Sequence, residues 1–394
     1  MSVSYAGRTA VVGIGATEFS KQSGRSELRL ACEAVSAALD DCGLRPADVD
    51  GLVTFTMDTN PEIDVARSLG IPELTYFSRI HYGGGAACAV LQQAALAVAS
   101  GVADVVVAYR AFNERSGRRF GAGTQDRPVE PTTDAVGRSW TNPFGLLTPA
   151  QQVAMFGRRY LHEYGLTTEA FGRVAVSTRE HAATNPKAWF YERPITLEDH
   201  QTSRWITEPL RLLDCCQESD GAQALVVTSI ERARHLPHVP AVIAAAAQGA
   251  ARDQFTMTSY YRDDLVTLPE MGLVGRQLYA QAGLGPSEVQ VGILYDHFTP
   301  FVLVQLEELG FCGPGEADAF VADGNLRLGG RLPTNTHGGQ LGEAYIHGMN
   351  GIAEAVRQLR GTAVNQVTGA ENVLVTAGTG VPTSGAILRR GETP

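Results

Sequence analysis

The chain has 394 residues, of which 44% are hydrophobic, and its formal net charge is −10 at pH 7. This length allows two core-bearing units of ordinary size, and the acidic charge argues against nucleic acid as the main partner. No Lys/Arg-led apolar segment begins the chain, and no apolar run reaches the roughly 18 residues that a membrane span needs, so we expect a cytoplasmic protein that stays off the membrane.

Short apolar segments alternate with amphipathic ones at the start of the chain, which predicts an α/β fold. Two of the apolar runs flank a unit in which a glycine turn leads into a helix, and this order predicts a parallel crossover. The predicted strands cover residues 9–15, 49–55 and 104–109, the first helix covers residues 28–42, and the turn-to-helix unit covers residues 80–101.

The alternation breaks between about residues 110 and 213. Gly, Pro, Trp and charged residues crowd residues 113–142, and helical patterns follow at residues 149–164 and 168–184. We interpret this region as an inserted cap or loop, because a structureless stretch of that length inside a compact unit is improbable. Regular strand pattern resumes at residues 221–228.

After a Pro-containing link, the C-terminal part repeats the same order of elements. Its predicted strands cover residues 241–247, 289–295 and 372–377, and its predicted helices cover residues 269–283, 299–310 and 351–359. A like order of elements suggests a duplication, although the residues themselves show no obvious repeat. We therefore predict two pseudo-repeated α/β halves that share helices at the centre, residues 1–236 with the inserted region and residues 237–394.

The cationic and thiol residues narrow the possible chemistry. The six cysteines show no framework spacing and are expected to be reduced. Only Lys21 and Lys187 are lysines, and neither has apolar neighbours that would lower the pKa of its amine, so we expect no Schiff-base lysine. The histidines do not have the spacing of a metal-binding helix face, so we expect no metal.

Residues 335–351 read NTHGGQLGEAYIHGMNG and resemble the C-terminal active-site motif of the thiolase superfamily, N-x-x-G-G-x-x-x-x-x-H-P-x-G-x-x-G. The Asn and Gly positions agree, but Tyr345 stands where thiolases have a catalytic histidine. Residues 48–55 and 292–298 resemble the sterol carrier protein type within that superfamily. The second of these looks like a strand that ends in H-D-C-F, with Tyr295 at the histidine and His297 at the cysteine. The resemblance implies a layered α-β-α-β-α fold.

The nucleophile motif departs furthest from that resemblance. Thiolases present a cysteine thiolate at a helix N-terminus, where the helix dipole lowers its pKa. The register that aligns the helix best puts Gly84 at this position, with Cys88 about one turn later. Cys88 is then a small core residue, or it is the nucleophile if the register is wrong. Residues 376–381, where a second cysteine is expected, contain no thiol.

Two phenols in place of imidazoles suit proton transfer better than nucleophilic attack. For a β-hydroxyacyl-CoA, one phenolate can take the hydroxyl proton while the carbon–carbon bond breaks, and the other phenol can protonate the thioester enolate. In thiolases, backbone N–H groups of the two glycine turns form an oxyanion hole, which by resemblance lies at Gly84 and Gly380 here. The predicted reaction is a retro-aldol cleavage.

The chain most resembles the steroid side-chain-cleaving, lipid-transfer-type aldolases of actinobacterial sterol catabolism. The resemblance implies cleavage of a 17-hydroxy-3-oxo-pregnene-20-carboxyl-CoA to propionyl-CoA and a 17-ketosteroid, androstenedione. It also implies a DUF35 (OB-fold) partner domain from a hydratase subunit, and a homodimer within a heterotetramer. The CoA thioester is the substrate, and no cofactor is expected.

The family's catalytic tyrosines correspond to Tyr295, which we favour as the base, and Tyr345. We expect supporting roles for His297, His337 and Asn335. Two other interpretations remain open. The first is an acetyl-CoA acyltransferase that uses Cys88, and the second is a non-catalytic subunit that binds acyl-CoA.

Overall fold

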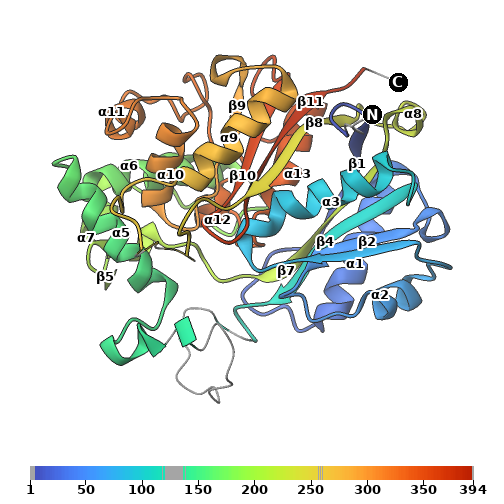
Figure 1. Cartoon of the computed structure of the whole chain (residues 1–394), viewed down its shortest axis with the longest axis horizontal. Coiled ribbons are helices and arrows are strands. Elements are labelled where there is room, and N and C mark those ends of the chain that lie inside the picture. Colours follow the sequence, from blue (N-terminus) through green and yellow to red (C-terminus); the bar gives the residue numbers. More distant parts are fainter. Residues whose placement is uncertain are drawn as a thin grey trace.

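The computed structural model describes residues 5–117, 119, 136–137, 139–255, 257, 259 and 261–392. Its centre is a nine-stranded mixed sheet in the order β3-β2-β4-β7-β1-β8-β11-β10-β9 (Figure 1). The strands are β1 (Thr9–Ala16), β2 (Gly51–Phe55), β3 (Tyr76–Ile80), β4 (Val105–Asn113), β7 (Asp220–Ser229), β8 (Ala241–Gly249), β9 (Val291–Ile293), β10 (Asn372–Ala377) and β11 (Thr383–Arg390).

The two halves of the sheet have mirrored strand orders. In the N-terminal half, β2 runs parallel to β3 and β4, and β7 is antiparallel to both β4 and β1. In the C-terminal half, β9 is parallel to β10, and β11 is antiparallel to both β10 and β8. The first strands of the halves meet in a short antiparallel pairing of Ala10 with Val242 and Val11 with Ala241. The predicted parallel crossover between β2 and β4 is confirmed.

Two helices lie between the halves and contact strands of both. Helix α3 contacts β2, β4 and β7 on one side and β8 and β11 on the other, and α13 contacts β9 and β10 as well as β1 and β7. The outer faces are covered by α1 and α2 in the N-terminal half and by α9 in the C-terminal half (Figure 1). The predicted α-β-α-β-α layering with shared central helices is confirmed. These helices are α1 (Glu27–Cys42), α2 (Glu62–Leu69), α3 (Ala87–Ala99), α9 (Pro269–Ala282) and α13 (Met349–Arg360).

Helix α1 illustrates how the sequence specifies these elements. The Ser26 side chain accepts a hydrogen bond from the backbone N–H of Arg29 and so caps the N-terminus, while Gly43, with φ of 69°, ends the helix in the left-handed conformation. The residues that α1 buries recur every four positions, mostly as neighbouring pairs, and are Leu30, Ala31, Ala34, Val35, Ala38, Leu39 and Cys42. This stripe packs on the outer face of the N-terminal strands.

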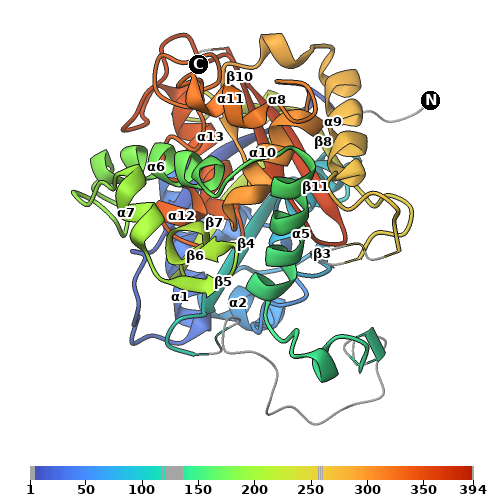
Figure 2. The same ribbon diagram turned by 90° about the vertical axis from the view of Figure 1, so that its left-hand side faces the viewer.

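The predicted inserted region forms a helical layer beside the C-terminal half (Figure 2). Its side chains Phe156 and Phe171 belong to the same hydrophobic core as Phe301 and Val304 of α10 (Thr299–Glu308). Part of the region, residues 118, 120–135 and 138, lies outside the described residues, and the division of the chain at residue 236 stays a prediction. The region contains α5 (Pro149–Glu163), α6 (Glu169–Thr184), α7 (Leu197–Thr202), β5 (Trp205–Thr207) and β6 (Leu210–Arg211).

The remaining helices are short, apart from α10. They are α8 (Ile230–Ala233), α10 (Thr299–Glu308), α11 (Ala317–Ala322) and α12 (Gly339–Gly342). No helix among the described residues is long and apolar enough to cross a membrane.

Candidate active site

A cavity of about 990 Å³ opens where turns from both halves meet. Its inner wall combines the glycine turn at residues 83–85 before α3, the residues after β9, the segment before α13 and the turn at residues 378–380 after β10. Loops that follow the carboxyl ends of strands are where α/β folds place ligand sites. The start of α5 and residues 204–218 form the outer wall, which the insertion supplies.

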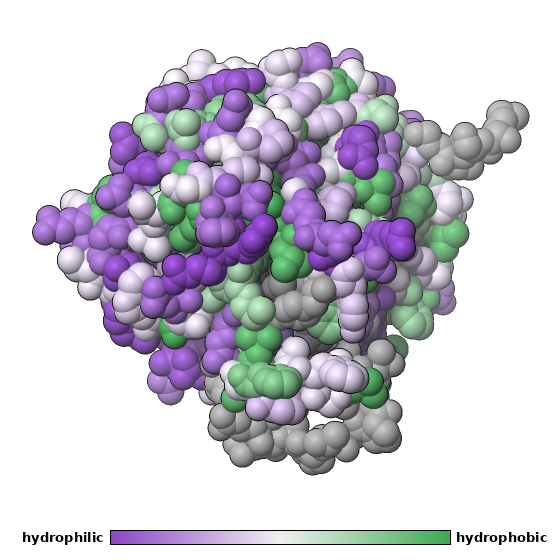
Figure 3. Space-filling model, turned by 60° about the vertical axis from the view of Figure 1, so that its left-hand side comes forward, coloured by the Kyte–Doolittle hydropathy of each residue, from purple (hydrophilic) through white to green (hydrophobic). Residues whose placement is uncertain are grey.

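The mouth of the cavity has exposed apolar side chains. Phe144 is 86% exposed and Trp140 is 74% exposed; Trp140 precedes Thr141 and Phe144 follows Asn142 by two residues, and Thr141 and Asn142 line the cavity. On the face of the molecule in Figure 3, hydrophobic residues gather in the lower middle of the view. An apolar mouth suits a substrate with a large apolar group.

Tyr295 and Tyr345 meet inside the cavity, with 3.2 Å between their hydroxyl oxygens. The backbone N–H of Tyr295 donates to Thr376 Oγ1 at 2.9 Å, and its carbonyl accepts from Gln305 Nε2 at 2.9 Å. The backbone N–H of Tyr345 donates to Ser219 Oγ at 3.2 Å. These contacts fix both rings from the backbone side, so the phenol groups face each other from the two motifs that resemble thiolase motifs.

The two phenols are electrostatically coupled. Burial raises the pKa of both well above the usual value. The contact between the two hydroxyls stabilises a phenolate on either ring, because the hydroxyl that keeps its proton donates to the oxygen that loses it. The pair therefore holds a single negative charge more readily than either phenol would alone.

Gly84 lies directly against the Tyr295 hydroxyl. A Cβ atom built on Gly84 would be 1.6 Å from Tyr295 Oη, far inside van der Waals contact. A cysteine therefore cannot occupy this position while Tyr295 keeps its place. The glycine at the nucleophile position and the tyrosine at the histidine position are physically linked substitutions, because one provides the space that the other fills.

Cys88 lies in the interior, away from the cavity. It is fully buried, its Sγ is 3.8 Å from the Val375 carbonyl oxygen, and it is not among the cavity-lining residues. Burial raises the pKa of its thiol far above the usual value. The thiolase interpretation requires an accessible thiolate, and the geometry does not supply one at Cys88.

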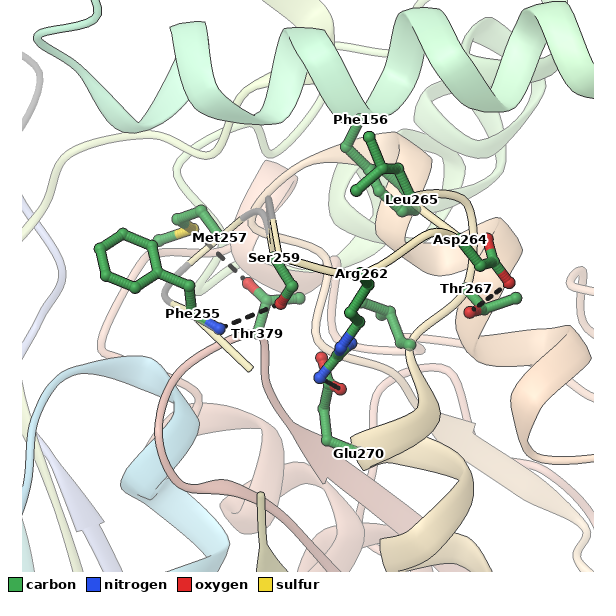
Figure 4. Close-up of a pocket in the computed structure, with 11 residues that line it drawn as sticks. Phe156, Phe255, Met257, Ser259, Arg262, Asp264, Leu265, Thr267, Glu270 and Thr379 are labelled. Carbon is green, nitrogen blue, oxygen red and sulfur yellow. Dashed lines mark hydrogen bonds and ion pairs between the residues drawn. The ribbon is translucent and has the colours of Figure 1, made fainter. Parts of the chain in front are cut away.

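His297 lines the cavity beside Tyr295, with its ring stacked at 5.1 Å on Phe301. Its Nε2 lies 2.9 Å from Thr379 Oγ1, and burial lowers the pKa of the ring to about 3. Thr379 also contacts Met257 Sδ at 3.5 Å. Figure 4 shows Met257 and Thr379 near the ion pair that joins Arg262 of the β8–α9 loop to Glu270 of α9. His297 is thus a neutral side chain held between the Phe301 ring and the Thr379 hydroxyl.

The second predicted oxyanion turn also reaches the cavity. Gly380 lines it, next to Gly85 of the first turn, and Gln254 Nε2 donates to the Gly380 carbonyl at 2.8 Å. Gln254 thereby anchors the turn from the side of the β8–α9 loop. The two glycine turns predicted to bind the thioester oxygen thus lie side by side.

Two of the predicted supporting residues, Asn335 and His337, do not line the cavity. The chain turns at Asn335, with φ of 53°, and at Gly338, with φ of 109°, and this directs both side chains into the interior. His337 Nε2 lies 3.9 Å from Glu343 Oε2, and the His337 carbonyl accepts from Asn185 Nδ2 at 2.8 Å. Both residues therefore lie on the interior side of the turn at residues 335–338 and not on its cavity side.

Lys21 and Glu114 were not anticipated as cavity residues. Lys21 Nζ donates to Gln217 Oε1 at 2.8 Å and lies 5.0 Å from the Trp189 ring centre, and burial lowers its pKa to about 8. The expectation that the surroundings of Lys21 do not lower the pKa of its amine was therefore wrong, since segments distant in sequence cover it. Glu114 is 3% exposed, and burial raises the pKa of its carboxyl well above the usual value. Neither residue carries a local motif that could have revealed it.

In the part of the chain that the structure describes, no group of three or more His, Cys, Asp or Glu side chains could hold a metal ion.

Comparisons with known proteins agree with the fold. The N-terminal domain model of thiolases matches residues 3–231, and the model described as thiolase C-terminal domain-like matches residues 250–389. The fold and the site define a protein of the thiolase superfamily. The chain is 71% identical over 382 residues to the steroid side-chain-cleaving aldolase of Thermomonospora curvata, covering 97% of this chain and 98% of that protein. Within the superfamily, the chain belongs to the family of steroid side-chain-cleaving aldolases.

Two further relatives are equally similar. The 17-hydroxy-3-oxo-4-pregnene-20-carboxyl-CoA lyase of Mycobacterium tuberculosis is 70% identical, over 97% of this chain and 99% of that protein. A solved structure, the Ltp2-ChsH2(DUF35) aldolase, superposes with a TM-score of 0.95 at 69% identity, over 99% of this chain and all of that one. The predicted family and the enzyme class of its members are thereby confirmed.

Proposed function

We propose that this chain cleaves a β-hydroxyacyl-CoA thioester by a retro-aldol reaction, with 17-hydroxy-3-oxo-4-pregnene-20-carboxyl-CoA as substrate and propionyl-CoA and androstenedione as products. The observation that carries the mechanism is the pair of phenols, 3.2 Å apart, in the space that Gly84 leaves open. The substrate assignment is supported by relatives about 70% identical over nearly the whole chain.

Tyr295 is the proposed base and Tyr345 the proposed acid. The Tyr295 phenolate takes the proton of the β-hydroxyl, the carbonyl of the ketone forms, and the electrons of the Cα–Cβ bond pass to the thioester as an enolate. Tyr345 then donates its proton to Cα, which completes propionyl-CoA. The contact between the two hydroxyls supports a division of the pair into base and acid, because a phenolate on one ring is stabilised by the hydroxyl of the other.

The same hydrogen bond can reset the enzyme. After one turnover Tyr295 carries the proton from the substrate hydroxyl, and Tyr345 lacks the proton that it gave to Cα. One proton transfer across the 3.2 Å contact restores both residues. The cycle is balanced: the Cα–Cβ bond breaks, the ketone carbonyl forms and the hydroxyl proton ends on Cα, so the reaction needs no oxidant, reductant or cofactor.

Backbone N–H groups at Gly84 and Gly380 are the proposed donors to the enolate oxygen. Both glycines line the cavity, and their turns touch each other. Preorganised donors at a developing oxyanion contribute about 10²–10³-fold each to the rate. His297, neutral and held by Thr379, is proposed to orient the Tyr295 ring, whose centre lies 4.8 Å from its own.

A DUF35 domain of a hydratase subunit is the proposed partner, supported by the Ltp2-ChsH2(DUF35) aldolase as a relative over the whole chain. We also propose a homodimer within a heterotetramer. Strand β3 lies at the edge of the sheet with Phe77 64% exposed, and an open edge of this kind suits pairing with a second copy. Because CoA thioesters are made and consumed inside the cell, we propose a cytoplasmic location.

The test is turnover of the purified complex with the DUF35 partner and the 17-hydroxy thioester. Release of propionyl-CoA and androstenedione is expected from the wild type. Tyr295→Phe and Tyr345→Phe should each lower kcat by about 10²–10⁴-fold, because each removes one proton-transfer group. Tyr279→Phe is the matched control: its hydroxyl donates to the Leu309 carbonyl at 2.8 Å, outside the cavity, so kcat should not change. Full activity of the double variant Tyr295→Phe/Tyr345→Phe would disprove the roles of the tyrosines.

A further inference from the structure

His347 lies two residues after Tyr345 and presents one ring edge to the cavity and the other to the interior. It is 2% exposed, yet it lines the cavity. Its φ of 51° is in the left-handed region, which costs backbone energy for a residue with a side chain. The chain therefore accepts strain to hold the ring in this position.

The interior edge is held by Arg110 of β4. Arg110 Nε lies 3.1 Å from His347 Nδ1, and Arg110 Nη1 makes an ion pair with Asp58 at 3.0 Å. Both charged side chains are almost completely buried. Arg110 Nη1 also donates to the Ala111 carbonyl at 2.8 Å, and the guanidinium lies 4.2 Å from the Phe112 ring centre. The guanidinium is therefore fixed in one orientation.

This contact determines the tautomer of His347. A guanidinium has only N–H donors and keeps its proton, so Nδ1 must be the acceptor and carry no proton. Burial and the Arg110 charge lower the pKa of the ring well below the usual value, so the ring stays neutral. The single ring proton is then on Nε2.

Nε2 lies at the first glycine turn. A Cβ atom on Gly83 would be 3.6 Å from it, and the His347 ring stands almost perpendicular to the Tyr345 ring, with 5.1 Å between the centres. Gly83 and Tyr345 both line the cavity. The donor thus lies beside both the proposed oxyanion turn and the proposed acid.

We infer that His347 is a further catalytic residue whose Nε2–H donates to the thioester oxygen of the acyl-CoA, and that Arg110, backed by Asp58, is a positioning residue that fixes this donor. The inference rests on the proposed retro-aldol function and adds a side chain to its oxyanion hole. A neutral donor suits the step, because it stabilises the enolate oxygen without giving its proton away, and the proton for Cα then comes from Tyr345.

The first test measures which nitrogen of the His347 ring carries the proton, in the wild-type protein and without substrate turnover. Nitrogen NMR of histidine-labelled protein, with the His347 signals assigned by their loss in His347→Gln, should show Nδ1 unprotonated and Nε2 protonated from about pH 6 to pH 9. In the double variant Arg110→Met/Asp58→Leu, which strands no buried charge, the signals should become those of exchanging tautomers. A proton on Nδ1 in the wild type overturns the inference.

The second test measures the donor directly. Propionyl-CoA labelled with ¹³C at the thioester carbonyl is bound to the complex with the DUF35 partner, and the carbonyl stretch is recorded by infrared difference spectroscopy. The stretch should move to lower frequency in the wild type, less so in His347→Leu, and in His347→Gln by an amount between the two, since glutamine keeps an N–H donor. An identical shift in the wild type and His347→Leu overturns the inference.

The third test compares kcat and KM of the wild type and the two His347 variants. His347→Leu should lower kcat by about 10²–10³-fold with KM changed only a few-fold, and His347→Gln should recover at least about tenfold of that loss. If the wild-type complex shows no cleavage, the proposed function fails, whereas the NMR and infrared results still decide whether His347 is a fixed donor. If cleavage proceeds and His347→Leu is as fast as the wild type, only the inference fails.

Discussion

The two ends of residues 335–351 differ in function although a single motif covers them. The cavity end, residues 345–348, supplies Tyr345 and His347 to the cavity wall. The scaffold end, residues 335–339, is buried against α6 and α13, where Thr336 Oγ1 donates to Glu354 Oε1 at 2.6 Å. Motif spacing thus identifies how a segment folds, whereas the direction in which each side chain points decides whether it contacts the substrate.

Gly348→Ala tests the cavity end of the segment and should have the largest effect on catalysis. Gly348 begins α13 with φ of 85°, and a Cβ atom there would lie 3.0 Å from a ring carbon of Tyr295. We expect kcat to fall by about 10²–10³-fold, because a displacement of about 1 Å in a reacting group costs this much. Steady-state kinetics of the complex measures it.

The control lies at the other end of the same helix. Gly361 ends α13 with φ of 77° and has no atom within 4 Å of a built Cβ. Gly361→Ala should therefore lower the free energy of unfolding by about 1 kcal/mol, as expected for a residue with positive φ, and leave kcat unchanged. An equal loss of kcat in both variants would mean that general destabilisation, and not the Tyr295 contact, causes the effect.

Thr379→Val tests a buried histidine on the cavity side. It removes the oxygen 2.9 Å from His297 Nε2 while keeping the side-chain volume. We expect kcat to fall about tenfold, since the ring beside Tyr295 is held less firmly. The melting temperature serves as the check that the fold is kept. Unchanged kcat would show that His297 belongs with the scaffold residues instead.

His337→Leu tests a buried histidine at the scaffold end and should leave kcat within about twofold of the wild type, because the residue does not line the cavity. Burial lowers the pKa of His337, so the native state binds fewer protons than the unfolded state near pH 6. Its contribution to stability is therefore present above the unfolded pKa of about 6.5 and is lost as the pH falls.

Urea denaturation of the wild type and His337→Leu between about pH 8 and pH 5 isolates this effect. The stability of the wild type relative to the variant should decrease as the pH falls below about 6.5, by at most about 1.4 kcal/mol per pH unit. A parallel pH profile for the two proteins would contradict a buried, neutral His337.

The sequence predicted the long elements well and the short or atypical ones poorly. The periodic helices α1, α5, α6 and α9 appear where expected, because each has a clear apolar stripe or a glycine at its end. Strand β3 was missed since Ser78 and Arg79 interrupt its apolar pattern at the sheet edge. Strand β11 was missed because Gly385 and its terminal arginines hide a buried strand.

The residues of the cavity were also predicted only where a local sequence pattern identifies them. Tyr295, Tyr345, Gly84 and Gly380 were found through motif resemblance, which preserves the turns that carry them. Lys21 could not be found, since its surroundings come from residues 189 and 217, distant in sequence. Asn335 and His337 share the motif with Tyr345, but two turns with positive φ direct them away from the cavity, and spacing does not report such turns.

Cys88→Ala should have the smallest effect. It tests, in the glycine turn that leads into α3, whether only the residues that border the cavity affect catalysis. Cys88 and Gly84 lie one turn apart before and within α3, but only Gly84 borders the cavity. Replacing the buried sulfur with hydrogen leaves a small void, so we expect a loss of stability of about 1 kcal/mol and no change in kcat. Propionyl-CoA release by Cys88→Ala at the wild-type rate would show that the reactive position passed from a thiol to the pair of phenols. A loss of activity as large as that of Tyr295→Phe would restore Cys88 as the nucleophile and contradict the cavity described above.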